Sequence, residues 1–168
     1  MNIRIYPDPV LREKAKEIKE FDTEHLDYII TAMQEVIKKH DAVGLAANQI
    51  GIMEQLIVIN VGNGSTAIIN PEIITKDGEE QQEEGCLSLP GVEFEMLHPK
   101  FMLVKGFDKY GEPQNIEATG LLAKVLEHEI DHLNGILIID KLSPSERLDF
   151  EIKWKRGDYE KKAPSRVL

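Results

Sequence analysis

Apolar residues recur at helical spacing in two stretches of the chain. In residues 23–40 they alternate with charged residues in a way that predicts an amphipathic helix, capped at its start by Asp22 or Thr23. The same spacing in residues 121–134 predicts a second helix, which Gly135 ends because glycine readily takes the left-handed conformation that closes a helix. The apolar positions are Leu26, Ile29, Ile30, Met33, Val36 and Ile37 in the first stretch, and Leu121, Leu122, Val125, Leu126, Ile130 and Leu133 in the second.

Shorter β-rich runs predict two hairpins. Residues 55–60 and 66–70 flank an Asn-Gly pair, which is a strong hairpin signal. Residues 101–107 and 114–119 flank a second polar turn. Between the two hairpins, the acidic and polar residues 76–84 are expected to form a solvated loop or edge.

The C-terminal part of the chain completes the predicted fold. A continuous apolar run at residues 136–139 predicts a short buried strand or core segment. A Ser-Pro-Ser-Glu capping box then opens a helix expected over residues 144–160, with residues 161–168 as a flexible tail. Because no repeat or long linker divides the chain, residues 1–168 are expected to form one domain. The predicted class is α+β, with antiparallel strands packed around a central helix and a further helix near each end.

Composition and charge narrow the class of protein. The 168 residues, 42% hydrophobic and 30% charged, fit a globular protein with a real core. A net charge of −10 disfavours non-specific binding to nucleic acid, and no specific DNA binding is expected. No apolar run is long enough for a membrane span, and the N-terminal residues lack the apolar core of a secretion signal. A cytoplasmic protein without membrane contact is therefore expected.

The second predicted helix carries the sequence His-Glu-Ile-Asp-His. On a helix, His128 and His132 stand one turn apart and project side by side, so that both imidazoles can bind one metal ion. Glu129 can reach a water bound to that ion, as in metal hydrolases of the H-E-x-x-H type. The alternative is a chance pattern in which both histidines are ordinary core residues. A catalytic metal needs a third protein ligand, which the rest of the chain has to supply.

Two further stretches carry candidate chemistry. Residues 41–51 are mostly small, with a few larger apolar residues among them, so another group can approach their backbone closely. Gln49 offers an amide donor and acceptor in this segment. Tight packing of a loop against a helix would explain the same pattern. Cys86 is the only cysteine, which rules out an intramolecular disulfide, and Gly85 beside it permits an unusual backbone path. Such a thiol is buried filler, a nucleophile or a metal ligand.

Taken together, GLAANQ, EGCLS and HEIDH resemble the three signature motifs of peptide deformylases, in the order and with separations similar to those of the family. This family removes the formyl group from the N-terminal formyl-methionine of new polypeptides. The chain departs from the pattern at Ala42, where the first motif commonly has a glycine. Alanine cannot take positive φ cheaply, so the backbone at Ala42 is expected to be one that both residues allow.

The resemblance implies that Cys86, His128 and His132 bind one divalent metal ion, with water in the fourth position. One thiolate and two imidazoles suit Fe(II), Zn(II) and related ions. In the family the native ion is usually Fe(II), which Zn(II), Ni(II) or Co(II) can replace.

The resemblance also implies roles in catalysis. Water activated by the metal attacks the formyl carbon, and Glu129 takes its proton and returns it to the departing amine. The side-chain amide of Gln49 and the backbone N–H of Leu87 donate to the developing oxyanion. Glu84 and Ser88 are expected to support the site without reacting.

The substrate is expected to bind beside these groups. Val43, Leu121 and Val125 match the family's apolar pocket for the methionine side chain. The peptide backbone is expected to pair with residues 43–44 and with residues 87–91. Gly44 and Gly85 are candidate binding residues.

Three rival interpretations remain open. A zinc endopeptidase would take its third ligand from elsewhere, such as Asp140 or Glu146. A cysteine hydrolase would use Cys86 as a nucleophile and would not need a metal. A structural metal would stabilise the fold without catalysis.

The C-terminal segment suggests one partner besides nascent chains. Residues 152–168 carry six basic residues and two acidic ones, so 6 − 2 = +4 in an otherwise acidic chain. A solvated helix and tail would explain this charge. The sharper hypothesis is a transient electrostatic contact with ribosomal RNA.

Overall fold

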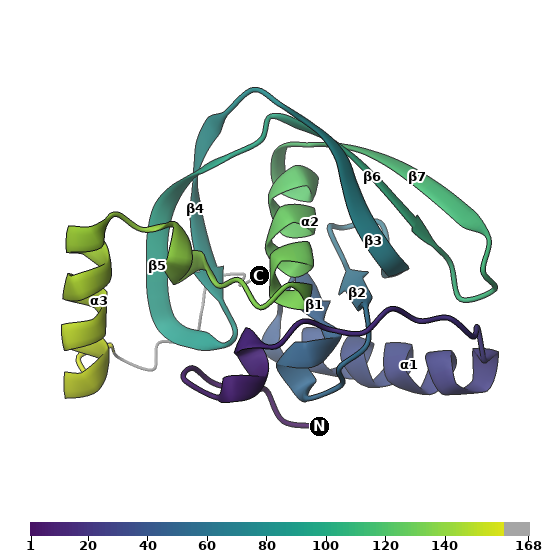
Figure 1. The fold of residues 1–168 in the computed structure, drawn as a ribbon, viewed down its shortest axis with the longest axis horizontal. Helices are drawn as coiled ribbons and strands as arrows, with labels where there is room; N and C mark the ends of the chain where they lie inside the picture. The colour runs from purple at the N-terminus through teal and green to yellow at the C-terminus, as the bar shows by residue number, and fades with distance from the viewer. Residues whose placement is uncertain (160–168) are drawn as a thin grey trace.

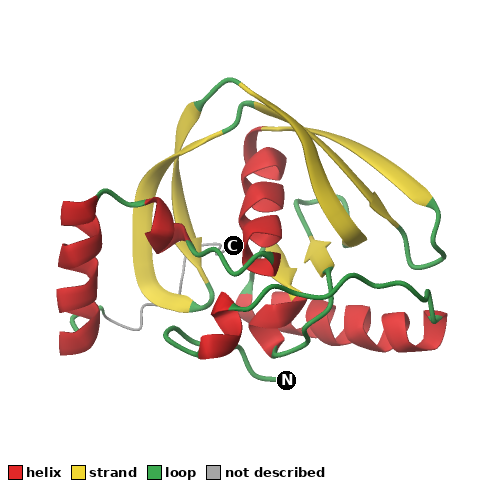
Figure 2. Ribbon diagram, in the orientation of Figure 1, coloured by secondary structure: helices red, strands yellow, loops and turns green. Residues whose placement is uncertain are grey.

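The computed structural model describes residues 1–159, which fold around helix α2 (Figure 1). A five-stranded antiparallel sheet, with the order β1-β2-β3-β6-β7, covers one side of α2, and a two-stranded sheet of β4 and β5 covers the other (Figure 2). The α+β class predicted from the sequence is confirmed. The strands are β1 (Gly44–Ala46), β2 (Leu56–Ile59), β3 (Thr66–Asp77), β4 (Glu80–Cys86), β5 (Leu89–His98), β6 (Phe101–Phe107) and β7 (Pro113–Thr119). The helices are α1 (Thr23–His40), α2 (Gly120–Leu133) and α3 (Pro144–Arg156), with 3-10 turns at Pro9–Arg12, Ala47–Ile50 and Ile138–Lys141.

Of the loop or edge expected at residues 76–84, the loop is wrong and an edge strand forms instead. Strand β3 continues to Asp77, and after a short turn β4 pairs with β5 in the second sheet. The polar composition of β4 did not indicate a strand, because only two of its residues, Glu84 and Cys86 near its end, are buried. A strand with one wet face needs few apolar residues, so hydrophobic alternation gave no signal. This pair of strands carries the sulfur side of the candidate site.

All three predicted helices form where expected. The Asp22 side chain caps α1 by accepting from the backbone N–H groups of Glu24 and His25, as the sequence predicts. The capping box at Ser143 begins α3, which ends at Arg156 rather than at residue 160, because Gly157 takes the left-handed conformation there. The expectation for residues 161–168 lies outside the described residues. Within residues 1–159, every helix is too short or too polar to cross a lipid bilayer.

The short strand suggested at residues 136–139 does not form. A 3-10 turn, Ile138–Lys141, stands there instead. Asp140 explains the difference, because its carboxylate accepts from the backbone N–H of Leu137 and pairs with Arg12 and Arg147. These contacts close a turn at the point where the apolar run would otherwise extend. The alternative prediction of a core segment is confirmed, since Leu137, Ile138 and Ile139 are buried.

Helix α2 packs against one apolar cluster and lies beside a second, whose Cys86 contacts His132 of the helix. Its apolar face packs against the five-stranded sheet through Val125, Leu126 and Ile130, among other buried residues. A separate apolar cluster joins Cys86 and the β5 residues to the Ile138–Lys141 turn and α3. The polar residues of α2 are therefore directed to the boundary between the two clusters. That boundary is where the histidines of α2 meet β4.

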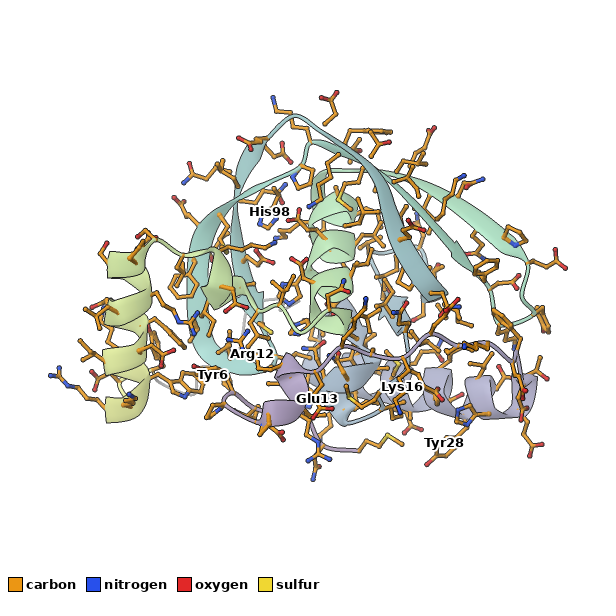
Figure 3. The ribbon with its side chains drawn as sticks, viewed as in Figure 1. Tyr6, Arg12, Glu13, Lys16, Tyr28 and His98 are labelled. Atoms are coloured by element: carbon orange, nitrogen blue, oxygen red, sulfur yellow. The ribbon has the colours of Figure 1, made fainter. Side chains whose placement is uncertain are left out.

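Phe150 anchors α3 to the rest of the molecule. It is fully buried, and its ring lies 5.9 Å from that of Tyr6 and 6.2 Å from that of Phe94 (Tyr6 in Figure 3). Replacing it with alanine is expected to lower the free energy of unfolding by about 3–5 kcal/mol, through lost burial and the cavity left behind. Urea unfolding of Phe150→Ala and of Leu148→Ala measures this. Leu148 is exposed on the same helix, so a similar loss in both variants would contradict the expectation.

Candidate active site

The only thiol of the chain and the two histidines of α2 meet in the interior. Cys86 lies at the end of β4, and its Sγ atom is 3.3 Å from Nε2 of His132. The Nε2 atoms of His128 and His132 are 3.0 Å apart, and the potential ligand atoms of all three residues lie within 4.8 Å of one another. All three side chains are buried. Within residues 1–159 this is the only cluster of at least three His, Cys, Asp or Glu side chains with ligand atoms so close.

This donor set fits a divalent transition metal. Two imidazole nitrogens and one sulfur converge on one point, away from bulk water. Two buried ring nitrogens that face each other can share at most one hydrogen bond, so a metal ion bound by both would stabilise the arrangement. Thiolate and imidazole are both ligands of catalytic zinc and also suit Fe(II), and with three protein ligands a four-coordinate ion would keep one position for water. The geometry thus meets the first requirement of the sequence-based interpretation, a third ligand close to both histidines.

Glu84 holds the ring of His128 in place. Its Oε1 atom is 2.5 Å from Nδ1 of His128, and its Oε2 atom is 3.0 Å from Nε2 of His98. Burial alone would raise the pKa of Glu84, but its contacts with the ring nitrogens of His128 and His98 hold that pKa well below its usual range. A carboxylate that accepts from Nδ1 fixes the tautomer and leaves Nε2 of His128 as the free ligand atom. The supporting role expected for Glu84 agrees with this geometry.

Glu129 presents a buried carboxylate without a hydrogen-bond partner among residues 1–159. Burial raises its pKa to about 7, while the positive charge of His128 opposes the shift and the negative charge of Glu84 adds to it. A carboxyl group with a pKa near neutrality can both take and return a proton at physiological pH. The side chain is therefore suited to the general base and acid role expected from the sequence.

Gln49 enters the site from the 3-10 turn after β1. Its Oε1 atom accepts from the backbone N–H of Ala46 at 2.9 Å. This bond directs the amide nitrogen, Nε2, towards Cys86 and Ser88. Nε2 lies 3.2 Å from Oγ of Ser88 and 3.8 Å from Sγ of Cys86. The amide donor is thus fixed beside the candidate metal ligands, and Ser88 takes part in holding it.

Asn48 and His98 support the site but were missed in the sequence. The side-chain amide nitrogen of Asn48 donates to the backbone oxygen of His132 at 2.5 Å, and this hydrogen bond connects the turn after β1 to α2. His98 contacts Glu84 from the end of β5. Asn48 lies inside the first motif, so its position was the available signal. A single histidine in a strand that was itself not predicted offered none.

The predicted substrate-binding residues come from β1 and its approach, from α2, and from the end of β4. Val43 and Val125 are buried in one cluster, and Gly44 contacts both Val125 and Glu129. Leu121 stands two turns before His128 on the same helix and is 41% exposed, so it belongs to the rim. The turn that contains Leu87 directly follows Cys86. In β4 itself, Gly85 pairs with Glu93.

Ala42 causes no backbone strain in the first motif. The left-handed conformation falls on Asp41, with φ of 49°, and not on Ala42. Asp41 ends α1, and its N–H donates to the carbonyl oxygens of Ile37 and Lys38. The sequence departs from the family's glycine at a position where alanine is tolerated, as expected.

The alternative third ligands are engaged elsewhere. Asp140 pairs with Arg12 and Arg147, and Glu146 accepts from the backbone N–H of Ser143 in the cap of α3. Neither belongs to the cluster of potential ligand atoms. The geometry therefore favours Cys86 over Asp140 or Glu146 as the third ligand.

Gly44 is the residue on which the position of Glu129 depends. A Cβ atom added there would lie 2.7 Å from Oε1 of Glu129 and 2.8 Å from Cγ1 of Val125. Gly44→Ala is expected to displace the carboxylate and lower kcat by about 10²-fold, the typical cost of misplacing a reacting group by an ångström. Metal content should stay at the wild-type value, because no candidate ligand moves. Activity at the wild-type level in Gly44→Ala would contradict the expectation.

Comparison with known proteins extends the likeness from three motifs to most of the chain. A model of the polypeptide deformylase family matches residues 1–148. A peptide deformylase from Thermoanaerobacter pseudethanolicus is 49% identical over 139 residues, which are 83% of this chain and 87% of that protein.

Solved structures give the same result. A peptide deformylase from Legionella pneumophila superposes with a TM-score of 0.87 at 40% identity, covering 94% of each chain. One from Thermotoga maritima superposes with a TM-score of 0.82 at 47% identity, covering 85% of this chain and 97% of the other. The resemblance suggested by the sequence is confirmed in both sequence and fold.

Proposed function

The chain belongs to the peptide deformylase family, and from this premise we propose that Cys86, His128 and His132 hold its catalytic metal. Enzymes of this family are metal-dependent hydrolases that remove the formyl group from the N-terminal formyl-methionine of new polypeptides. The observation that carries the assignment of residues is the convergence of three buried ligand atoms beside the unpartnered carboxylate of Glu129.

We take Fe(II) as the native ion, with Zn(II), Ni(II) or Co(II) able to replace it. Thiolate and imidazole ligands suit each of these ions, so availability decides which one is bound. A bound ion of this kind lowers the pKa of water and polarises a carbonyl oxygen.

The protein itself moves the proton. Glu129 receives the proton of the attacking water and delivers it to the nitrogen of the departing amine, which leaves formate as the other product. Its fully buried position and its raised pKa suit both transfers, because the proton is bound neither too weakly nor too tightly near neutral pH.

The chain also supplies fixed donors for the carbonyl oxygen as it gains charge. The amide N–H of Gln49 is one, because the hydrogen bond from the backbone N–H of Ala46 to Oε1 leaves Nε2 directed at the site. The backbone N–H of Leu87 is the second. Donors fixed in advance cost no reorganisation during the reaction, which is why such groups contribute strongly to catalysis.

The methionine side chain is assigned to the apolar surface formed by Val43, Val125 and the more exposed Leu121. The absence of a side chain at Gly44 leaves the approach to Glu129 open. Main-chain pairing with residues 43–44 and with residues 87–91, next to Gly85, would ignore most substrate side chains. An enzyme that acts on many nascent chains needs such tolerance.

Formate release from a formyl-Met tripeptide tests the proposal. The protein is prepared without oxygen, loaded with Ni(II) or Fe(II), and its metal content is measured. Release that depends on the metal supports the proposal, whereas no release from fully loaded protein overturns it. Cleavage of internal peptide bonds in the same sample would support a zinc endopeptidase instead.

We further propose that the basic C-terminal segment contacts the ribosome in the cytoplasm, where formylated chains emerge. Lys155 and Arg156 are exposed at the end of α3, so they are free to meet RNA phosphates. Truncation at Ile152 would also remove Trp154, which packs against Phe150. The sharper test is Lys155→Glu with Arg156→Glu. Binding to ribosomes that is unchanged in this double variant would disprove the contact.

A further inference from the structure

His98 occupies a place that neither the fold nor the reaction explains. It ends β5 on the side towards α2 and is only 1% exposed (Figure 3). Its Nε2 atom is 3.0 Å from Oε2 of Glu84, although the angle departs from that of a straight hydrogen bond. Neither Nε2 nor Nδ1 makes a hydrogen bond of good geometry to any atom of residues 1–159. An imidazole buried without full pairing is costly, so a compensating role is expected.

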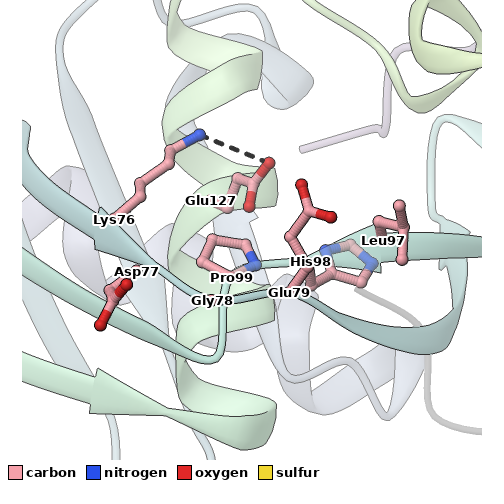
Figure 4. Close-up of a pocket in the computed structure, with 8 residues that line it drawn as sticks. All are labelled: Lys76, Asp77, Gly78, Glu79, Leu97, His98, Pro99 and Glu127. Atoms are coloured by element: carbon pink, nitrogen blue, oxygen red, sulfur yellow. Dashed lines mark ion pairs between the residues drawn. The ribbon is translucent and has the colours of Figure 1, made fainter.

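His98 also lines a surface pocket of about 370 Å³ at the turn between β3 and β4 (Figure 4). Two of its lining residues, Lys76 and Glu127, form an ion pair at 3.6 Å (Figure 4). The ring of His98 therefore stands between this pocket and Glu84, with both of its nitrogens shielded from solvent. At 3.0 Å from Oε2 of Glu84, Nε2 needs only a small rotation of the ring to donate to that oxygen while the ring is neutral. The pocket is lined by Lys76, Asp77, Gly78, Glu79, Leu97, His98, Pro99 and Glu127.

Glu84 connects two rings with its two oxygens. Oε1 accepts from Nδ1 of His128 and Oε2 faces His98, and both side chains are buried. A carboxylate with only one fixed oxygen can rotate, and its hydrogen bond to His128 would then lose its direction. A partner on the second oxygen prevents this rotation. The order of contacts is His98, Glu84, His128 and then the candidate metal.

We propose that His98 is a positioning residue for the metal site, which acts through Glu84 to hold the ring of His128 with Nε2 directed at the metal. This inference rests on the proposed function, since it requires that His128 is a ligand. His98 touches neither substrate nor metal, so its effect is on metal affinity and on kcat, and KM for the formyl peptide is unchanged.

The test compares three variants at and beside this position. His98→Phe keeps a flat ring but cannot donate, and His98→Gln restores an N–H donor of similar reach. Leu97→Ala is the matched control, because Leu97 lines the same pocket but is exposed and points away from Glu84. Zn(II) affinity is measured by competition with a chelator, and the Co(II)-loaded proteins are compared by their visible absorption spectra.

The affinity of His98→Phe for Zn(II) is expected to fall by about 3–10-fold, less than the 10–100-fold cost of losing a direct partner of a metal-bound histidine, because Glu84 remains bonded to His128. His98→Gln should recover most of this loss, and Leu97→Ala should match the wild type. The Co(II) spectrum should change in His98→Phe alone. Wild-type affinity and an unchanged spectrum in His98→Phe would overturn the proposal.

A measurement on the unmodified protein covers the case in which His98→Phe does not fold. Nitrogen-15 NMR of the Zn(II)-loaded wild type reports which ring nitrogen of His98 carries the proton. A protonated Nε2 supports the proposal, and an unprotonated Nε2 overturns it. If the wild type binds no metal at all, the proposed function fails as well, which separates that failure from a failure of His98 alone.

Discussion

Glu129→Gln is expected to lower kcat for formate release by about 10²–10⁴-fold, the usual contribution of general acid and base catalysis. The amide has the same shape as the carboxyl group, but it cannot take a proton from water and return it to the amine. Because Glu129 is fully buried, carboxylates on the protein surface cannot take over its proton transfer. The variant should keep its metal, because Glu129 is not among the ligand atoms that converge.

Steady-state kinetics on metal-loaded protein measure the effect, with metal content determined in the same samples. Glu117→Gln is the matched control, since Glu117 is an exposed carboxylate on the neighbouring strand β7 and its replacement should leave kcat unchanged. A Glu129→Gln variant with full metal content and wild-type kcat would remove Glu129 from the mechanism. The proton would then have to travel through another group of the site.

Local sequence patterns were enough to predict the parts of the site that lie on one element. His128, Glu129 and His132 share a helix whose periodicity and end signal are strong, so their mutual geometry followed from the spacing alone. The distance from Cys86 to His132 could not follow in this way, because it depends on how β4 packs against α2. Only the resemblance to a family joined these residues before the fold was known.

The second sheet shows why the remainder was out of reach. Strand β4 carries Glu84 and Cys86 but is otherwise polar, and β5 begins with a proline at its second position, which argues against a strand. Both strands form because they pair with each other, and their inner ends are buried against α2 and the 3-10 turn at Ile138–Lys141. Such pairing is a long-range property. His98, at the end of β5, was hidden for the same reason.

Cys86→Ser is expected to weaken Zn(II) binding by more than about 100-fold, beyond the 10–100-fold typical of losing a residue that only supports a ligand. The thiolate is the one anionic ligand of the proposed set, and a neutral hydroxyl is a far weaker donor for these ions. The fold should survive, since the exchange removes little volume from the cluster around Cys86. Competition with a chelator measures the affinity, and thermal unfolding checks the fold.

Cys86→Asp serves as the matched variant, because it restores an anionic ligand atom at the same position. Its affinity for Zn(II) should lie between those of Cys86→Ser and the wild type. The two rival mechanisms predict different results for the serine variant. An endopeptidase with its third ligand elsewhere would keep both metal and activity, and a cysteine hydrolase would lose activity while the wild type resists chelation. Loss of metal together with loss of formate release in Cys86→Ser, and partial return of metal binding in Cys86→Asp, is the combination that only a Cys-His-His metal site produces.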